Sequence, residues 1–437
     1  MAPSIVILGS GIIGVSTAYY LSQSSPASSI HLVEPSPELF ASASGFAGGF
    51  LAADWFSPSV AALGKLSFEE HRRLAEEFGG REKWGYSRST GLSYTARKGS
   101  RIEKRGDDWL RQDSSRSDTA VVVSEFADGH AGLLGPEWLS RSAGDKIDSI
   151  SEEGSTAQVW VRSVTDSTQE LNSIITDFSC RDPRRLCQFL LAACSERGVQ
   201  LHHPARAVSI DKDMRDELSS IRLVNTKTNM VSDIPCSKIL IAAGAWSAQV
   251  FSTLFPTSQT KIPISSLAGH SIVVRSPRWS KEHDEKGCHA IFTSDEDGYS
   301  PELFSRMGGE IYIAGLNDAS LALPKLATDS KIEEGAVSKL KKAAQRLLGT
   351  TENLEEIEVV RKGLCFRPIT KQGTPIMTNI HDENLGGLST RGAGEGGVWL
   401  AAGHGPWGIS LSLGTGKVMS EMIIGKSTSV NVERLRP

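Results

Sequence analysis

The chain has 437 residues, of which 39% are hydrophobic and 22% charged, a composition typical of a globular protein of two or three domains. Its net charge of −4 gives no electrostatic reason to expect a nucleic acid or an anionic membrane as partner. No apolar run approaches ~18 residues, so no membrane span is predicted. The 6 scattered cysteines form no CxxC pair, and no secretory signal precedes the first strand, so we expect a cytoplasmic location.

The beginning of the chain predicts a strand, a glycine-rich turn, a helix and a second strand. The first three lie in "SIVILGSGIIGVSTAYYLSQ", and the second strand lies in "SIHLVEPS" (29–36). Strand, helix and strand within about 30 residues form a βαβ unit, which implies a parallel sheet.

The turn of this unit has the GxGxxG spacing of a dinucleotide site. Gly9 permits a tight turn, Gly11 lets a diphosphate approach the backbone, and Gly14 lets the helix pack closely on the strand. The N-terminus of the helix then offers free N–H groups to the phosphates. Glu34 ends the second strand, where a carboxylate can accept hydrogen bonds from both ribose hydroxyls and would repel the 2′-phosphate of NADP. The alternative is a glycine turn that binds no ligand.

Farther along the chain, signals of a parallel sheet alternate with signals of antiparallel strands. "SKILIAAGAWS" (237–247) is a buried strand ending in a glycine turn, and residues 396–425 read as a strand, a glycine-rich turn and a helix. "LAGHSIVVRSP" (267–277) and "GGEIYIAGLND" (308–318) alternate as antiparallel strands do. Helices are predicted within residues 59–79, 181–203 and 329–349, a small-residue loop at 42–50 and a polar surface segment at 97–120. This order predicts two interleaved domains built from discontinuous segments.

Cys365 and Arg367 stand two residues apart in "KGLCFRPITKQGTPIM" (362–377), just before a Gly-x-Pro turn. This is the spacing of one face of a strand, which a bulge would disrupt. A guanidinium offers a bidentate fork to a carboxylate, and the alternative is a buried arginine paired with an internal acid. Cys365 is either a reactive thiol or a small buried residue.

Together these motifs resemble the D-amino-acid oxidase-like family of FAD-dependent oxidoreductases, which includes glycine oxidase, sarcosine oxidase and the amadoriases. Within this family the chain is most similar to a fungal group. The resemblance spans the chain from end to end, and its motifs follow the family's order: "ILGSGIIGVSTAYYL", "LVEPS", "SASGFAGG", "ILIAAGAWS", "GLCFRPITKQGTPIM" and "GHGPWGISLSLGTGKV".

The resemblance implies an α/β fold in which a FAD-binding Rossmann domain of the glutathione-reductase type is interleaved with an antiparallel-sheet α+β substrate domain. The FAD-binding domain is expected in residues 1–60, 178–256 and 360–437, and the substrate domain in residues 61–177 and 257–359. The implied reaction oxidises a C–N bond of a small-molecule amine or amino acid to an imine, with O2 as electron acceptor and H2O2 as product. A monomer or a small homo-oligomer is expected.

The resemblance also assigns cofactor residues by position. Val208 is expected to contact adenine through its backbone, Ser44 the diphosphate or flavin, and residues 403–409 the edge of the isoalloxazine. The full set expected to bind FAD is Gly9, Gly11, Ile12, Ile13, Gly14, Glu34, Ser44, Gly48, Gly49, Val208, Gly244, Trp246, Cys365, Gly403, His404, Gly405, Trp407, Gly408 and Ile409.

On the substrate side, Arg367 matches the arginine with which glycine oxidase-like members bind the substrate carboxylate. Cys365 stands where sarcosine oxidases and amadoriases join a cysteine to the flavin 8α-methyl group. A covalent bond to FAD and a free buried thiol are therefore both open. Glycine oxidases have the arginine without the cysteine, and sarcosine oxidases have the cysteine without this arginine, so one of the two assignments can fail.

Two further residues are candidate catalytic groups. His404 is a candidate for proton transfer because imidazole titrates near neutral pH, with a flavin contact or a turn position as alternatives. Tyr312 stands where sarcosine oxidases carry a lysine that activates O2, so a dehydrogenase with another electron acceptor remains an alternative to the oxidase. A third alternative is a flavoprotein with mainly a binding or trafficking role. No spacing of His, Cys, Asp and Glu predicts a metal site.

Overall fold

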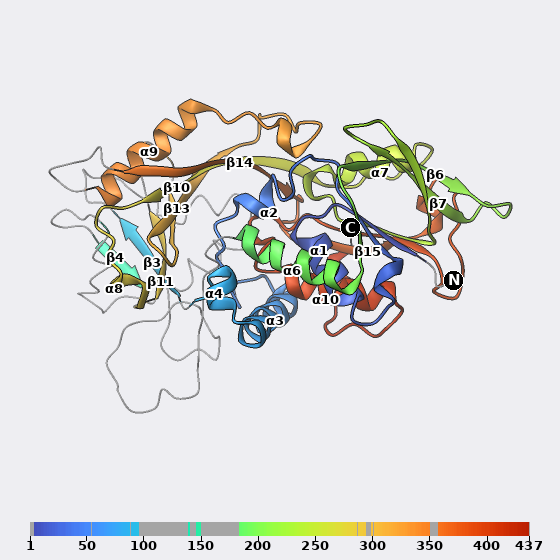
Figure 1. Cartoon of the computed structure of the whole chain (residues 1–437), viewed down its shortest axis with the longest axis horizontal. Coiled ribbons are helices and arrows are strands. Elements are labelled where there is room, and N and C mark those ends of the chain that lie inside the picture. The colour runs from blue at the N-terminus through green and yellow to red at the C-terminus, as the bar shows by residue number, and fades with distance from the viewer. Residues whose placement is uncertain are drawn as a thin grey trace.

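The computed structural model describes residues 4–53, 55–87, 89–95, 139, 146–149, 183–285, 287–293, 299, 301–349 and 357–436. The polar segment 97–120 and the predicted domain boundary near residue 177 lie outside these residues. The described chain forms sheets of six, seven and three strands, with helices packed around them (Figure 1).

The first strand of the chain lies inside the six-stranded sheet, as the βαβ pattern predicts. β1 (Ile5–Leu8) is buried and pairs in parallel with β2 and with β9. Only the pairing of β15 with β16 is antiparallel among the pairings of this described sheet. The strand order is β15 (Ile376–Ile380), β16 (Gly397–Ala402), β9 (Lys238–Ile241), β1, β2 (Ile30–Val33) and β5 (Gln200–His202).

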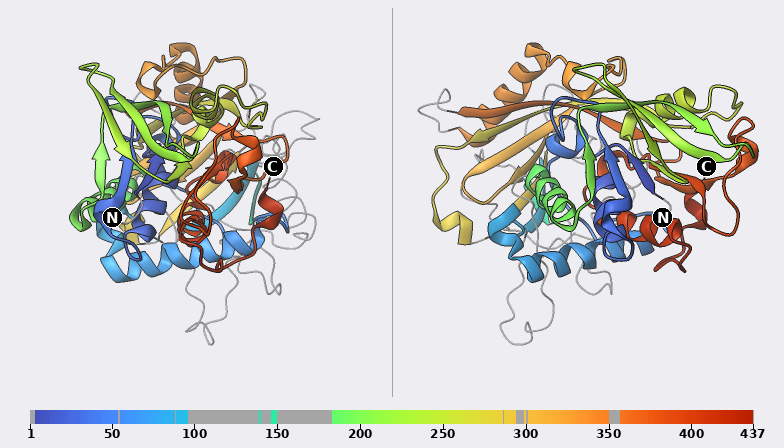
Figure 2. Two further views of the ribbon diagram at one scale, coloured as in Figure 1. Left: turned by 90° about the vertical axis from the view of Figure 1, so that its right-hand side faces the viewer. Right: turned by 45° about the vertical axis from the view of Figure 1, so that its right-hand side comes forward.

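Both faces of the six-stranded sheet are covered. On one face α1 (Ile12–Leu21) packs against α6 (Pro183–Arg197) and α10 (Ser412–Ile423), and α10 packs against α3 (Ala61–Phe78). Figure 2 shows α3 along the outer side of this helical layer. The other face packs against α7 (Ser247–Leu254) and a three-stranded antiparallel sheet, which consists of β6 (Ala205–Lys212), β7 (Leu218–Asn225) and β8 (Val231–Pro235).

The seven-stranded sheet contains the predicted antiparallel strands. Its order is β14 (Glu358–Ile369), β10 (Ser265–Arg275), β13 (Glu310–Asp318), β12 (Glu302–Ser305), β11 (Cys288–Thr293), β3 (Ser89–Thr95) and β4 (Lys146–Ser149). α9 (Glu334–Leu348) covers one face, where Leu340 and its neighbours pack on Ile272 and Ile313. The short helix α8 (Glu282–Glu285) precedes β11.

The face of this sheet that points away from α9 carries Cys365 of β14. Residues directly opposite one another on paired strands share a face, and Gly269 of β10 pairs with both Cys365 and Asn317. The β10–β13 pairing skips Gly315, which has a φ of +130°. This bulge puts Asn317 and Tyr312, five residues apart in β13, on the same face as Cys365, whereas an unbroken alternation would separate them.

Two local predictions can be compared with the structure. The small-residue loop predicted at 42–50 contains a one-turn helix, α2 (Ala43–Phe46), followed by α3 and then α4 (Gly80–Trp84). α2 packs so closely on the preceding backbone that a Cβ at Gly45 would lie 2.1 Å from the carbonyl oxygen of Phe40, which only glycine avoids. The predicted helix within 181–203 is α6, which ends where Gly198 adopts a φ of +99°.

A buried carboxylate joins three helices of the layer. Glu70 of α3 accepts hydrogen bonds from Tyr20 Oη (2.8 Å), Arg73 Nε (3.0 Å) and Lys417 Nζ (2.7 Å), which come from α1, α3 and α10. Burial by itself would raise the pKa of Glu70, but these hydrogen bonds outweigh burial and lower it.

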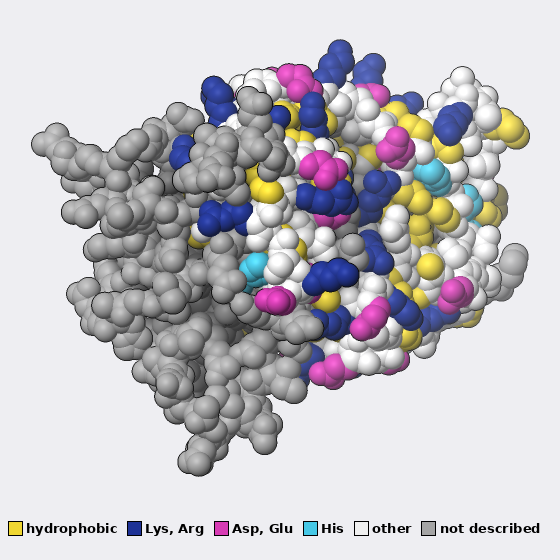
Figure 3. Space-filling model, turned by 60° about the vertical axis from the view of Figure 1, so that its left-hand side comes forward, with side chains coloured by type: hydrophobic (Ala, Val, Ile, Leu, Met, Phe, Trp, Pro, Cys, Tyr) yellow, Lys and Arg dark blue, Asp and Glu magenta, His cyan; other side chains and the backbone are white. Residues whose placement is uncertain are grey.

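The surface on the side of the seven-stranded sheet carries charges of both signs. Figure 3 shows Lys and Arg side chains among Asp and Glu side chains on the described part of this face. Exposed ion pairs among the described residues include Arg73–Glu77 within α3 and Lys362–Glu334 between β14 and α9. Among the described residues, no helix has both the length and the apolar character needed to cross a bilayer.

Replacing Glu70 by alanine is expected to lower the free energy of unfolding by roughly 2–4 kcal/mol, because it leaves Lys417 and Tyr20 without their acceptor. The matched control is Glu77→Ala on the same helix, which removes only the exposed pair with Arg73 and is expected to cost less than about 0.5 kcal/mol. Urea denaturation measures both. Because the folded-state pKa of Glu70 is lowered, its contribution is present at neutral pH and is lost as the pH falls through that value. Equal costs for the two variants would contradict this role of Glu70.

Candidate functional site

A cavity of about 640 Å³ lies between the carboxyl-terminal edge of the six-stranded sheet and the face of the seven-stranded sheet that carries Cys365. Its wall includes the glycine turn after β1, the loop 41–50, the start of β6, the turn after β9 and the turn after β16. A cavity of this size falls within the range of cofactor pockets, roughly 300–1,000 Å³. Ligands bind at this edge in open sheets of this kind because the helix N-termini and turns converge there.

Hydrogen bonds hold the carboxylate of Glu34 in a fixed orientation at the end of the cavity formed by β1 and β2, which we name the nucleotide end. Glu34 lines the cavity, and its Oε2 accepts hydrogen bonds from the Ser10 N–H (3.2 Å) and Oγ–H (3.1 Å). Its Oε1 accepts one from the Ser36 N–H (3.1 Å). The carboxylate keeps further lone pairs with which it could accept hydrogen bonds from a ribose, so the predicted role of Glu34 stays a prediction. Val208 lines the same end of the cavity.

The glycines of the first turn have the local roles that their spacing predicts. Gly9 has a φ of +105°, and a Cβ on Gly14 would lie 1.9 Å from the Gly9 carbonyl oxygen. Gly14 therefore serves helix–strand packing and does not line the cavity, whereas Gly9 and Gly11 do. The hydroxyl of Ser44 accepts a hydrogen bond from the Ile12 N–H (2.9 Å), so it satisfies one free donor of α1 beside the cavity.

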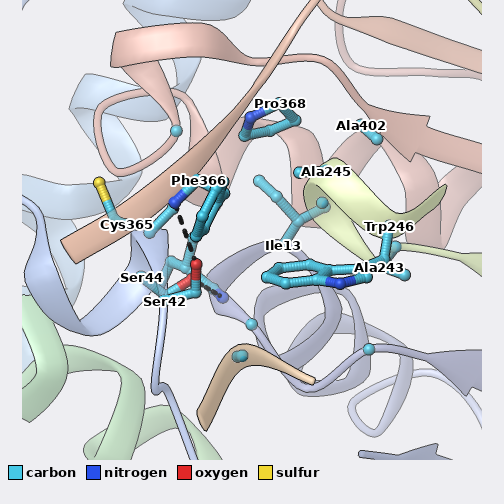
Figure 4. Close-up of a pocket in the computed structure, with 18 of the residues that line it drawn as sticks. Ile13, Ser42, Ser44, Ala243, Ala245, Trp246, Cys365, Phe366, Pro368 and Ala402 are labelled. Carbon is cyan, nitrogen blue, oxygen red and sulfur yellow. Dashed lines mark hydrogen bonds between the residues drawn. The ribbon is translucent and has the colours of Figure 1, made fainter. Parts of the chain in front are cut away.

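The close-up in Figure 4 shows how the middle of the cavity is built. Ser42 and Ser44 come from the loop around α2, and Ser42 Oγ accepts a hydrogen bond from the Phe366 N–H of β14 (3.3 Å). Trp246 lines the cavity and donates its Nε1–H to the Pro324 carbonyl (2.7 Å). The other residues predicted to bind FAD that line the cavity are Ile12, Ile13, Gly48, Gly49, Gly244, Cys365, His404, Gly405, Gly408 and Ile409.

The turn after β16 is held mainly by α3. His71, which is buried, donates its Nε2–H to the Ile409 carbonyl oxygen (2.9 Å), and burial lowers its pKa to about 4. Ser67 Oγ accepts a hydrogen bond from the Gly414 N–H (3.0 Å), and Ser410 Oγ accepts one from the Ala52 N–H (2.8 Å). These bonds fix the turn that is expected to border the flavin.

His404 is not placed as a group that titrates near neutral pH. It is buried, its Nε2 is hydrogen-bonded to Thr415 Oγ1 (3.1 Å), and burial lowers its pKa to about 3. Its Nδ1 is buried and has no hydrogen-bond partner among the described residues. His404 as a residue lines the cavity. A neutral imidazole with one buried nitrogen left for a ligand suits a cofactor contact better than proton transfer.

Trp407 and Gly403 were predicted to contact the flavin, and neither lines the cavity. The Trp407 ring is buried against Phe56 (4.8 Å between centroids) and Trp55 (6.4 Å), so it packs in the core. Gly403 packs against Thr370, whose methyl group a Cβ at Gly403 would approach to 2.5 Å. The position of Trp407 within the turn did not predict the direction of its side chain. The ring packs on the neighbouring aromatic side chains and not on the cavity.

Arg367 extends from β14 across β10 toward β13. Its Nη1 donates a hydrogen bond to Asn317 Oδ1 (2.5 Å), two strands away. The strand between them carries Gly269, where a Cβ would lie 3.1 Å from both Arg367 Nη2 and Asn317 Oδ1. The missing side chain at Gly269 therefore makes room for this guanidinium, which lines the cavity with one nitrogen already held by a neutral partner.

Cys365, Arg367 and Tyr312 lie on this same face. The bulge of β14 falls before Cys365 and so does not separate it from Arg367, and Tyr312 pairs with Val273, which shares the face of Gly269. Burial raises the pKa of the Cys365 thiol, and the neighbouring Arg367 guanidinium opposes this rise. Burial, together with the charge of Cys365, raises the pKa of Tyr312 to about 12, against the opposing effect of Arg367. At neutral pH both side chains are therefore protonated.

Aromatic rings enclose the cavity beside Tyr312. The Phe304 ring stacks on Tyr312 (5.9 Å between centroids) and on Phe50 (5.7 Å). Gly48 fits against this stack because a Cβ there would lie 2.3 Å from the Phe304 ring. Buried Arg306 donates from Nη2 to the carbonyl oxygens of Ala47 (3.1 Å) and Gly48 (3.3 Å), so it anchors this loop.

The residues of the cavity fit FAD. The glycine turn and the N-terminus of α1 suit a diphosphate, and the oriented carboxylate of Glu34 suits a ribose. Among the described residues, the buried Nδ1 of His404 has no hydrogen-bond partner, so it could bond to a polar atom of the cofactor. Fold and site together define a dinucleotide-binding oxidoreductase.

Comparison with known proteins identifies the family. The model of the FAD dependent oxidoreductase family matches residues 4–422, and the chain belongs to this family. Two fungal proteins whose names give the class oxidoreductase are similar along nearly their full lengths. C1F5.03c of Schizosaccharomyces pombe is 26% identical (99% of this chain, 97% of that protein), and TDA3 of Saccharomyces cerevisiae is 24% identical (99% and 94%).

Solved structures share the fold at low sequence identity. Glycine oxidase from Geobacillus kaustophilus has a TM-score of 0.66 at 18% identity and covers 100% of this chain and 98% of its own. Iminodiacetate oxidase from Chelativorans sp. BNC1 has a TM-score of 0.64 at 16% identity (99% and 98%). L-proline dehydrogenase from P. horikoshii has a TM-score of 0.64 at 14% identity (100% and 97%).

Sequence reasoning missed several residues of the cavity wall. Phe304 and Glu302 of the wall lie in β12, a four-residue strand without a motif. Asn317 does not line the cavity but holds Arg367, and it lies near the end of β13. The only signal for Asn317 is a polar side chain after the apolar run "IYIAGL". Lys325 comes from a segment in which no pattern was found.

His404→Gln is expected to flatten the pH dependence of stability. Because burial lowers the folded-state pKa of His404 from 6.5 to about 3, the unfolded chain binds this proton first, and stability falls as the pH drops below 6.5. Removing the imidazole should reduce the slope between pH 6 and 4 by up to about 1.4 kcal/mol per pH unit. Urea denaturation across this range measures the slope. The control is His381→Gln, which alters an exposed histidine; equal slopes in both variants would contradict a neutral buried His404.

Proposed function

We propose that this protein is an FAD-dependent oxidase that oxidises the C–N bond of an amine or amino acid carrying a carboxylate. The product is an imine, which hydrolyses in water, and the electrons pass to O2 to give H2O2. The observation that carries this proposal is the Arg367 guanidinium, which lines the FAD cavity and is braced by Asn317.

Arg367 suits a carboxylate for geometric and electrostatic reasons. A guanidinium offers parallel N–H donors that match a carboxylate, and a charge-assisted pair is strong inside a cavity that excludes water. The amide oxygen of Asn317 holds Nη1 without neutralising the positive charge. A substrate carboxylate at Arg367 would hold the adjacent C–N bond inside the cavity in which FAD is expected.

FAD, when bound, supplies the acceptor for the hydride equivalent that leaves the substrate carbon. The residues of this chain bind the substrate and orient it toward the cofactor. Arg367 fixes the carboxylate, Tyr312 keeps its Oη proton because its pKa is about 12 and can donate a hydrogen bond, and the Phe304 ring excludes water beside it. Neutral His404 would contact the cofactor through Nδ1 without a change in its own charge at neutral pH.

Two of the structural neighbours are named as oxidases of glycine and of iminodiacetate, and both compounds have a carboxylate next to an amine. These names support the proposed substrate class for a chain with the same fold. The 5 described cysteines are free thiols, which supports the proposed cytoplasmic location. The monomer or small homo-oligomer remains a prediction.

A dehydrogenase that passes its electrons to another acceptor is the second candidate. Tyr312, which is uncharged at neutral pH, supports it because sarcosine oxidases are expected to use a lysine at this position to activate O2. A neighbour of the same fold is named as a dehydrogenase of L-proline. Release of H2O2 during turnover favours the oxidase, whereas turnover only with an artificial acceptor favours the dehydrogenase. Bound flavin that no substrate reduces would favour a binding or trafficking role.

Arg367→Ala is expected to lower kcat/KM for an active amino acid at least 100-fold, mainly through KM, because the substrate carboxylate loses its partner. Arg367→Lys should recover only part of this loss, since an ammonium lacks the fork. The readout is the initial rate of flavin reduction or peroxide release. The control is Lys362→Ala on the same strand, which alters an exposed side chain paired with Glu334. An unchanged KM in Arg367→Ala would contradict the substrate class.

We also propose that Cys365 is a free thiol and that FAD is bound without a covalent bond. Bond formation to the flavin 8α-methyl group requires a thiolate, and burial, the largest influence here, raises the pKa of Cys365 despite the nearby Arg367. Precipitation of the yellow protein in acid should therefore leave the flavin colour in the supernatant. Colour in the pellet of the wild type that is lost in Cys365→Ser would instead establish the thioether.

A further inference from the structure

The segment 321–327, which we name the strap, connects β13 to α9 and crosses from the seven-stranded sheet to the nucleotide end of the cavity. Lys325, Leu326 and Ala327 of the strap line the cavity together with Glu34 and Ser36. The strap thus starts at the seven-stranded sheet and reaches the part of the cavity that is formed by the residues after β1 and β2.

Three contacts hold the strap against the FAD-binding elements. The Ala327 N–H donates to Ser36 Oγ (3.2 Å), and the Trp246 Nε1–H donates to the Pro324 carbonyl (2.7 Å). Leu321 and Leu323 pack on the cluster that contains Ala245, Ala268, Leu364 and Phe366. Ser36 also donates its N–H to Glu34, so the residue that orients the ribose-binding carboxylate also receives the strap.

A short turn shapes the end of the strap. The Leu326 N–H donates to Asp329 Oδ2 (3.2 Å), and the Asp329 N–H donates to the Leu326 carbonyl (3.0 Å). This turn presents Lys325 at the rim of the cavity, where its side chain is exposed. Among the described residues, no acidic side chain forms an ion pair with Lys325.

We propose that the strap closes the ADP half of the FAD site and that Lys325 binds the FAD diphosphate. The diphosphate is the only anionic group of FAD, and the carboxylates that line the cavity, Glu34 and Glu302, do not pair with Lys325. A flexible ammonium on a four-carbon stem reaches an anion from the rim of a site. FAD then enters and leaves only after the contacts at Ser36 and Trp246 break. The proposal rests on FAD binding and not on the proposed substrate.

The first experiment titrates apoprotein with FAD and follows the quenching of flavin fluorescence at several salt concentrations. Lys325→Gln should weaken FAD binding roughly fivefold to tenfold at low salt and reduce the dependence of the dissociation constant on salt. Lys325→Arg should stay close to the wild type. The control is Lys331→Gln, an exposed lysine beyond the strap that does not line the cavity. The same affinity and salt dependence in Lys325→Gln and Lys331→Gln would overturn the role of Lys325.

The second experiment tests closure with the double variant Ser36→Cys, Ala327→Cys. A disulfide between these positions should slow FAD release in bromide dialysis at least tenfold relative to the same variant in its reduced form, and a reductant should reverse this slowing. Equal release rates in the oxidised and reduced protein, with the disulfide verified by mass, would overturn the closure. If acid precipitation shows covalent flavin, both experiments use the Cys365→Ser background. Failure of the wild type to bind FAD would refute the cofactor itself, a result distinct from either failure of the strap.

Discussion

The site depends on one constraint, the position of a sheet face against a sheet edge. The carboxyl-terminal edge of the six-stranded sheet supplies turns and helix N-termini, and the face of β14, β10 and β13 supplies side chains. The bulge at Gly315 decides which side chains these are, because it returns Asn317 to the face of Cys365 and Tyr312. The absent side chain of Gly269 then lets Arg367 reach Asn317 across the middle strand. Substrate recognition, as proposed, follows from these two glycines as much as from the arginine.

The edge and the face are held together by polar groups far apart in the sequence. Glu70 joins α3 to α1 and α10, the helices that follow the two turns at either end of the cavity. His71, one residue later on α3, holds the Ile409 carbonyl of the second turn. A single helix therefore holds the turn after β16 and the helices that follow both turns. Such pre-organisation would keep the proposed cofactor and substrate in one geometry, which a reaction between two bound molecules requires.

The sequence was informative where local chemistry determines structure. The GxGxxG turn, Glu34 and the glycine turns predicted the dinucleotide site, because each of these residues is needed for a backbone geometry or a charge within its own segment. The wall residues Phe304 and Lys325, and Asn317 as the partner of Arg367, could not be predicted in the same way. Those positions depend on strand register, a bulge and a connection between sheets, and none of these leaves a periodic pattern in the sequence. The expected place of Trp407 in the cavity wall differs from the structure for a related reason. The sequence identified its turn but could not give the direction of its side chain.

The central claim, oxidation of a carboxylate-bearing amine by bound FAD, is tested most directly by anaerobic mixing of the purified yellow protein with a panel of amino acids and amines. This measurement does not presume O2 as the acceptor. The account predicts bleaching of the flavin absorbance by at least one compound with a carboxylate next to its amine, and no bleaching by the same amine without the carboxylate. Bleaching by amines regardless of a carboxylate, or by no compound although the flavin is photoreducible, would contradict it.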